Sequence, residues 1–118
     1  MRHKNAKAIL NRPADQRRSM VRNLLTSLFL YGKVQTTDAR AKALSSAVEK
    51  LITLVKRQEE DFNKIRELNR VLYTENASRH ALTYIMKTTK TSGFSRRVKI
   101  GFRGGDGALL VHVELIQE

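Results

Sequence analysis

The apolar residues of this 118-residue sequence change their spacing once, and this change most strongly constrains the fold. Between residues 13 and 87 they recur every three or four positions, which is the period of amphipathic helices. From Val98 onward they alternate with polar residues, which is the period of half-buried strands. The sequence therefore predicts a helical part followed by a β-hairpin, combined in one small domain of the α+β class.

The helical part divides into four amphipathic patterns with one short strand between the first two. Pro13 marks a helix start, Gly32 marks its end, and Thr37 is a suitable N-cap for the next helix. The stretch 33–36 between them is β-prone. The four apolar stripes are Met20, Val21, Leu24, Leu25, Leu28 and Phe29; Leu44, Val48, Leu51, Ile52 and Val55; Phe62, Ile65, Leu68, Val71 and Leu72; and Ala77, Ala81, Leu82 and Ile85.

Two strand patterns flank a glycine-rich turn at residues 104–107 and predict an antiparallel hairpin. Because a two-stranded ribbon alone is only marginally stable, we expect it to pair with the strand around Val34. The predicted architecture has two layers, in the order helix, strand, three helices and two strands, with a small mixed sheet packed under the helices. On this pattern Phe102 lies on the apolar strand face and is expected in the core.

The charge is concentrated in two segments. The chain has 23 Lys plus Arg against 11 Asp plus Glu, a net charge of +12. Residues 1–23 and 87–103 together hold 13 basic residues and one acid, so the remainder is neutral. Residues 1–12 have no apolar period and are expected to form an extended basic arm on a single globular domain, 13–118. Such an arrangement indicates a polyanionic partner, most often nucleic acid.

Other classes of function find little support in the sequence. There is no cysteine, the three histidines are scattered, and the glycines of the turn lack the Gly-Lys-Ser/Thr ending of a phosphate-binding loop. We therefore expect no catalytic residue, metal, cofactor or small-molecule substrate.

An apolar run of eight residues is too short for a membrane span, and no signal or transit peptide is recognisable. A DNA-binding regulator is the alternative, and a small hydrolase is the third choice. The regulator is disfavoured because the basic residues lie mostly off the strongest helix.

Five blocks of sequence along the chain carry a family resemblance. They are Met1-Arg2-His3-Lys4 with Leu10-Asn11-Arg12; Val34 to Thr37 with Arg40 to Leu44; Val48 to Lys56; Gly93 to Arg96; and Arg103 to Asp106 with Val113-Glu114-Leu115. These blocks resemble the bacterial-type ribosomal protein L-seventeen family of the large subunit. The resemblance implies a non-enzymatic structural protein bound to large-subunit ribosomal RNA near the polypeptide exit region, with the same order of elements. One departure is Arg97, where the family favours an apolar residue, so this position is expected to face RNA or solvent.

The expected partners are therefore large-subunit ribosomal RNA and neighbouring ribosomal proteins, in the ribosome of the cytoplasm rather than of an organelle. Cations are expected to contact phosphates, residues 36 and 37 to reach RNA where a helix begins, and Phe94 to stack on a base. The predicted RNA-binding residues are Arg2, His3, Lys4, Lys7, Asn11, Arg12, Arg17, Arg18, Arg22, Thr36, Thr37, Lys42, Phe94, Arg96, Arg97, Lys99 and Arg103.

Overall fold

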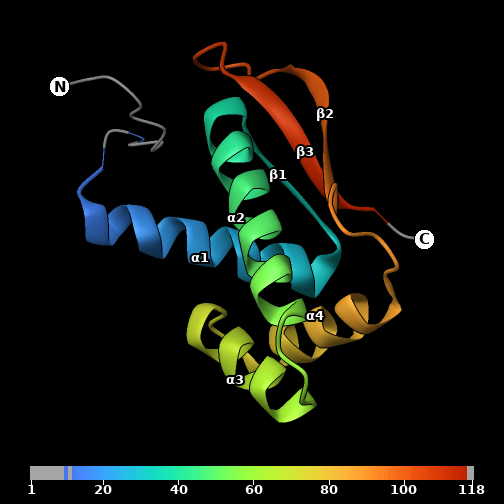
Figure 1. Cartoon of the computed structure of the whole chain (residues 1–118). Coiled ribbons are helices and arrows are strands. Elements are labelled where there is room, and N and C mark those ends of the chain that lie inside the picture. Colours follow the sequence, from blue (N-terminus) through green and yellow to red (C-terminus); the bar gives the residue numbers. More distant parts are fainter. Residues whose placement is uncertain (1–9, 11, 117–118) are drawn as a thin grey trace, which may run out of the picture.

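The structure is a computed structural model that describes residues 10 and 12–116 (Figure 1). The chain order in this part confirms the predicted α+β class and the predicted sequence of elements. The elements are α1 (Ala14–Tyr31), β1 (Lys33–Thr37), α2 (Asp38–Lys56), α3 (Asp61–Val71), α4 (Glu75–Lys87), β2 (Ser95–Phe102) and β3 (Leu109–Leu115).

Local signals account for several helix boundaries. Gly32 ends α1 in the left-handed region at φ 82°, and its N–H donates to the carbonyl oxygen of Leu28 at 2.7 Å. Glycine adopts this conformation without the steric penalty that other residues meet. Helix α4 begins after Thr74, whose side-chain oxygen accepts a hydrogen bond from the N–H of Ala77 at 3.2 Å.

The sheet has the strand order β1-β3-β2, with β3 in the centre. Strand β3 runs antiparallel to both neighbours, with Lys33 opposite Glu114 and Phe102 opposite Leu109. The expected mixed sheet is therefore corrected to an antiparallel one. The reason is topological. The hairpin makes β3 antiparallel to β2, and β1 runs in the same direction as β2, so β3 is antiparallel to β1 as well.

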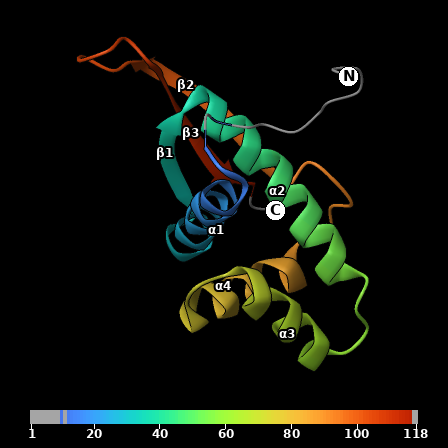
Figure 2. The same ribbon diagram turned by 90° about the vertical axis from the view of Figure 1, so that its left-hand side faces the viewer.

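One face of the sheet is covered by helices, and the other is open. Helix α2 contacts all three strands, and α1 packs against α2, α4 and β1 (Figure 2). On β3, Val111, Val113 and Leu115 are buried, whereas the alternate positions 110, 112 and 114 are half-buried. This is the alternation predicted from sequence. The core is completed by the stripe of α2 and by residues such as Leu28 and Leu68, which are fully buried.

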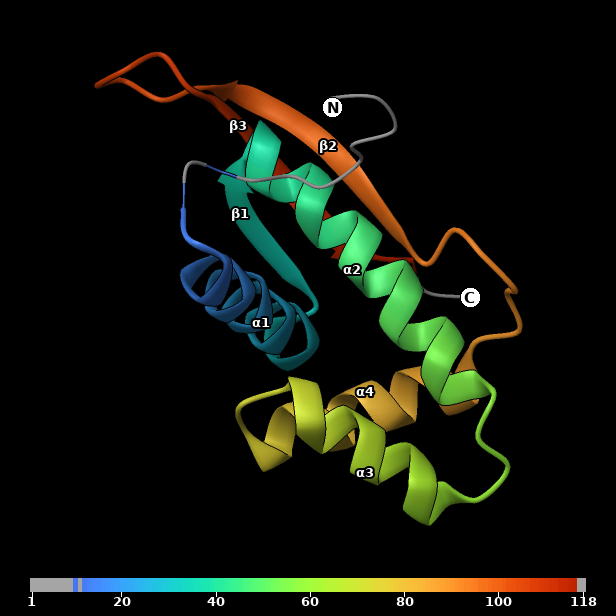
Figure 3. The same ribbon diagram turned by 60° about the vertical axis from the view of Figure 1, so that its left-hand side comes forward.

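The apolar residues of β2 do not join this core. Phe102 is 76% exposed, and Val98 and Ile100 are also exposed. The prediction that Phe102 is a core residue is wrong because Phe102 ends an edge strand, beside a hairpin turn that projects beyond the start of α2 (Figure 3). The pairing of β2 with β3 is also shifted by a bulge between Lys99 and Gly101.

Candidate nucleic-acid interface

One side of α1, from Asp15 to Ser27, and the first turn of α2 border an open groove with a volume of about 590 Å³. Arg12 and Arg40 both line this groove, together with polar side chains of α1 such as Asn23. Sequence reasoning missed Arg40, because it lies outside the two basic segments, in the remainder of the chain that carries no net charge. Its position could have indicated a role, because Arg40 lies in the first turn of a helix. The free amides of a helix N-terminus favour a bound anion, and a cation beside them adds to that attraction.

The three predicted cations of α1 differ in their surroundings. Arg18 is exposed and Arg17 half-buried, and neither forms an ion pair within residues 12–116. Arg22 instead donates from Nε to the carbonyl oxygen of Val71 at 2.7 Å. Its guanidinium carbon also lies 4.3 Å from the centroid of the Tyr73 ring. Arg22 thus links α1 to the connection between α3 and α4, which occupies part of its donor capacity.

The predicted contacts around the start of α2 are only partly at the surface. Thr36 lies opposite Val111 and shares its buried face, so its assignment to the RNA interface is corrected. Thr37 is half-buried at the N-cap position of α2. Lys42 is exposed, and its Nζ lies 3.4 Å from an oxygen of Asp38, one helical turn earlier. An exposed pair of this kind holds its partners weakly, so Lys42 stays available to a phosphate.

Strand β2 presents two cations without an acidic partner in the described part of the chain. Arg97 and Lys99 are exposed, and neither takes part in an ion pair there. Exposure of Arg97 agrees with the expectation that this position faces RNA or solvent. Arg96 differs, because its Nε donates to Oε1 of Glu114 on β3 at 3.0 Å.

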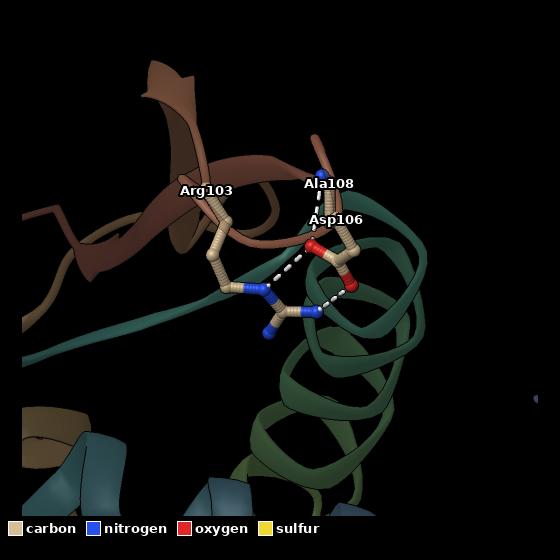
Figure 4. A network of polar contacts seen from close by, with 3 residues as sticks. All are labelled: Arg103, Asp106 and Ala108. Carbon is tan, nitrogen blue, oxygen red and sulfur yellow. Dashed lines mark hydrogen bonds and ion pairs between the residues drawn. The ribbon is translucent and has the colours of Figure 1, made fainter.

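Arg103 and Asp106 form an ion pair across the hairpin turn (Figure 4). Nε of Arg103 donates to one carboxylate oxygen at 2.9 Å, a terminal nitrogen donates to the other, and Ala108 N–H donates at 3.2 Å. The hydrogen bond from Arg103, followed by that from Ala108, lowers the pKa of Asp106 well below its ordinary value. The pair therefore closes the turn, which agrees with Asp106 as a turn residue, and it partly neutralises Arg103.

Phe94 is fully buried, so the prediction that it stacks on a base is wrong. Two side chains hold its backbone. The carboxylate of Glu49 accepts hydrogen bonds from the N–H of Phe94 at 2.7 Å and of Gly93 at 3.3 Å. The Tyr84 hydroxyl donates toward the carbonyl oxygens of Phe94 and Ile116, at 3.1 and 2.8 Å. The sequence signal was misleading because a glycine before an aromatic residue in a basic segment fits a loop tip and a buried anchor equally well.

The remaining predicted RNA-binding residues, Arg2, His3, Lys4, Lys7 and Asn11, lie outside the described residues. Among those described, the start of α1, the start of α2 and the hairpin turn lie toward one side of the molecule (Figures 1 and 3). Helices α3 and α4 lie at the other end. The fold therefore places parts of the two basic segments, 1–23 and 87–103, on the same side of the molecule.

Comparison with known proteins decides the family. The family model described as ribosomal protein L17 matches residues 20–116. The chain belongs to the ribosomal protein L17 family. It is 42% identical over 109 residues to the large ribosomal subunit protein bL17 of Thermoanaerobacter sp., covering 91% of this chain and 96% of that protein. The bL17 proteins of Carboxydothermus hydrogenoformans, at 43% over 91% of this chain and 96% of theirs, and Desulforapulum autotrophicum, at 37% over 98% and 97%, are similar too.

Membership of the ribosomal protein L17 family confirms the resemblance noted from the sequence and the expectation of a structural protein that is not an enzyme. Within residues 12–116 no group of histidine, aspartate and glutamate side chains has an arrangement that could hold a metal ion. None of the helices described is both long and apolar enough to cross a membrane.

In this L17-family chain, Glu49 fixes the position at which β2 begins, because it holds two amides of the preceding loop. Replacing Glu49 with glutamine removes one acceptor oxygen and the charge while keeping the shape. We expect Glu49→Gln to lower the free energy of unfolding by about 1–2 kcal/mol, measured by urea denaturation. The matched control is Glu67→Gln, which breaks an ion pair with Arg70 on α3 and is expected to cost less than about 0.5 kcal/mol. Equal costs for the two variants would contradict the role of Glu49.

Proposed function

We propose that this chain is a structural constituent of the large ribosomal subunit that binds folded large-subunit ribosomal RNA through phosphate contacts, near the polypeptide exit region. The observation that carries the proposal is the concentration of exposed cations in two segments of an otherwise neutral chain. Arg12 and Arg18 lie at the start of α1, Arg97 and Lys99 lie on β2, and the half-buried Arg40 lies in the first turn of α2. The name of the relatives, large ribosomal subunit protein bL17, supports the same partner.

The mechanism is electrostatic and does not require a particular base sequence. Lysine and arginine neutralise phosphates and release the condensed counterions, which gives affinity that depends strongly on salt. The planar guanidinium groups also bind phosphate through two parallel hydrogen bonds. Because the grooves of folded RNA present shape and backbone more than base edges, cations spread over helix starts and a strand suit such a target.

The proposal includes roles for the parts of the chain that the structure does not describe. Residues 1–12 act as a basic arm that orders between RNA helices on binding, and residues 13–118 form the globular domain. Neighbouring ribosomal proteins contact the neutral surface, and the protein works in the ribosome of the cytoplasm, where it supports translation.

Sedimentation in a sucrose gradient tests the proposal. We expect the full chain to migrate with large subunits at low salt. A variant that lacks residues 1–12 is expected to incorporate less efficiently, because it loses four of the chain's 23 Lys and Arg side chains. Its urea denaturation midpoint is expected to stay unchanged, because every core residue in the described part of the chain lies after residue 12. A full chain that remains at the top of the gradient, free of large subunits, would contradict the proposed function.

A further inference from the structure

Phe102 is the one aromatic residue of β2, and a β-bulge determines the direction in which its side chain points. Lys99 is opposite Val111 and Gly101 is opposite Leu110, so Ile100 is an extra residue on β2. Bulges of this kind redirect the side chains that follow them. Without the bulge, Phe102 would follow the alternation of Val98 and lie on the open face of the sheet.

The bulge instead places Phe102 on the same face as the two unpaired cations of β2. Residues directly opposite each other in an antiparallel pair project to the same side of the sheet. Arg97, Lys99 and Phe102 lie opposite Val113, Val111 and Leu109 respectively, which alternate along one face of β3. Arg97, Lys99 and Phe102 therefore form one row, which we call the β2 row.

The side chains of the β2 row are exposed, although the row lies on the face of the sheet that α2 packs against. Strand β2 is an edge strand, and the hairpin turn that follows it projects beyond the start of α2 (Figure 3). Phe102 is 76% exposed, and Arg97 and Lys99 have no ion-pair partner in residues 12–116. An exposed aromatic ring beside two free cations indicates a ligand that presents both an apolar planar face and negative charge.

We propose that the β2 row binds an unstacked nucleotide of RNA, with the base on the ring of Phe102 and the neighbouring phosphates on Arg97 and Lys99. This inference rests on the proposed function and adds a contact to a base. Stacking on an aromatic ring is indifferent to base identity, because every base has a π-face. An acidic protein strand added to the edge of β2 is the alternative occupant. It is disfavoured because main-chain pairing along that edge makes no use of the exposed ring of Phe102.

A single tryptophan provides the test, because the chain contains none. Phe102→Trp introduces a fluorophore at the proposed stacking position. Tyr31→Trp is the matched control, since Tyr31 is also 76% exposed but ends α1, two residues before β1 begins at the opposite end of the sheet from Phe102. Each variant is titrated at low salt with a short unstructured single-stranded RNA, an RNA duplex of the same length and an acidic peptide. Binding is followed separately by the anisotropy of a label on each probe.

We expect the single-stranded RNA to quench the emission of Phe102→Trp in proportion to binding, and to leave that of Tyr31→Trp nearly unchanged. The duplex, whose bases are already stacked, is expected to bind without quenching. Phe102→Ala is expected to lower the affinity for single-stranded RNA about 5- to 150-fold, and Phe102→Tyr to restore it.

The possible failures are distinguishable. RNA that binds both tryptophan variants without selective quenching of Phe102→Trp overturns the stacking contact and leaves the proposed function standing. A response of Phe102→Trp to the acidic peptide alone overturns the choice of RNA as its occupant. If the wild-type chain binds neither RNA in the anisotropy measurement at low salt, the proposed function fails together with the inference.

Discussion

Replacing Phe94 with alanine is expected to cost about 3–5 kcal/mol of unfolding free energy, which is the largest loss we predict for one side chain. Phe94 is fully buried and is among the largest of the side chains that the structure buries completely. Its removal leaves a cavity where the start of β2 meets α2 and α4, and tightly packed surroundings relax only in part. Since many domains of this size are stable by only about 5–15 kcal/mol, we expect a large part of the stability to be lost.

Urea denaturation of Phe94→Ala measures this loss, and Phe62→Ala is the control. Phe62 lies on α3 and is 66% exposed, and the guanidinium carbon of Arg66 lies 4.7 Å from its ring centroid. Its replacement is expected to cost less than about 1 kcal/mol. Similar costs for the two variants would show that Phe94 does not anchor the fold, and would reopen the question of a surface role for it.

The affinity of the chain for large-subunit ribosomal RNA is expected to fall by about a thousandfold or more between about 50 and 200 mM salt. A loss of this size corresponds to about six phosphate contacts. The exposed cations of the described surface include Arg12, Arg18, Lys42, Arg97 and Lys99, and residues 2–7 add three more basic side chains. Filter binding across a series of salt concentrations measures the slope, and a flat response would contradict phosphate contacts as the source of affinity.

The helical part was predictable because each helix carries its own signals. The stripe of Leu44, Val48 and Ile52 lies at helical spacing, and these residues are fully buried as predicted. Gly32 ends α1 because its position requires a left-handed conformation. These features depend on residues within a few positions of each other, and such patterns can be read directly from the chain.

The candidate site was less predictable because its details depend on contacts between distant residues. Arg22 and Val71 are 49 positions apart, and nothing near Arg22 in the sequence indicates that it is held within the fold. The roles expected for Phe94 and Phe102 are reversed in the structure, where Phe94 is the core residue and Phe102 is exposed. A local alternation pattern does not reveal which strand is at the edge or where a bulge shifts the register.

The central claim is that cations in specific segments, and not the net charge as such, bind RNA. The most direct test compares the salt slopes of two double variants that remove the same charge. Arg97→Gln with Lys99→Gln is expected to reduce the slope by about two, because each lost phosphate contact changes it by about one. Arg66→Gln with Arg70→Gln, on α3 at the other end of the molecule, is expected to leave it unchanged. Equal slopes for the two double variants would contradict the claim.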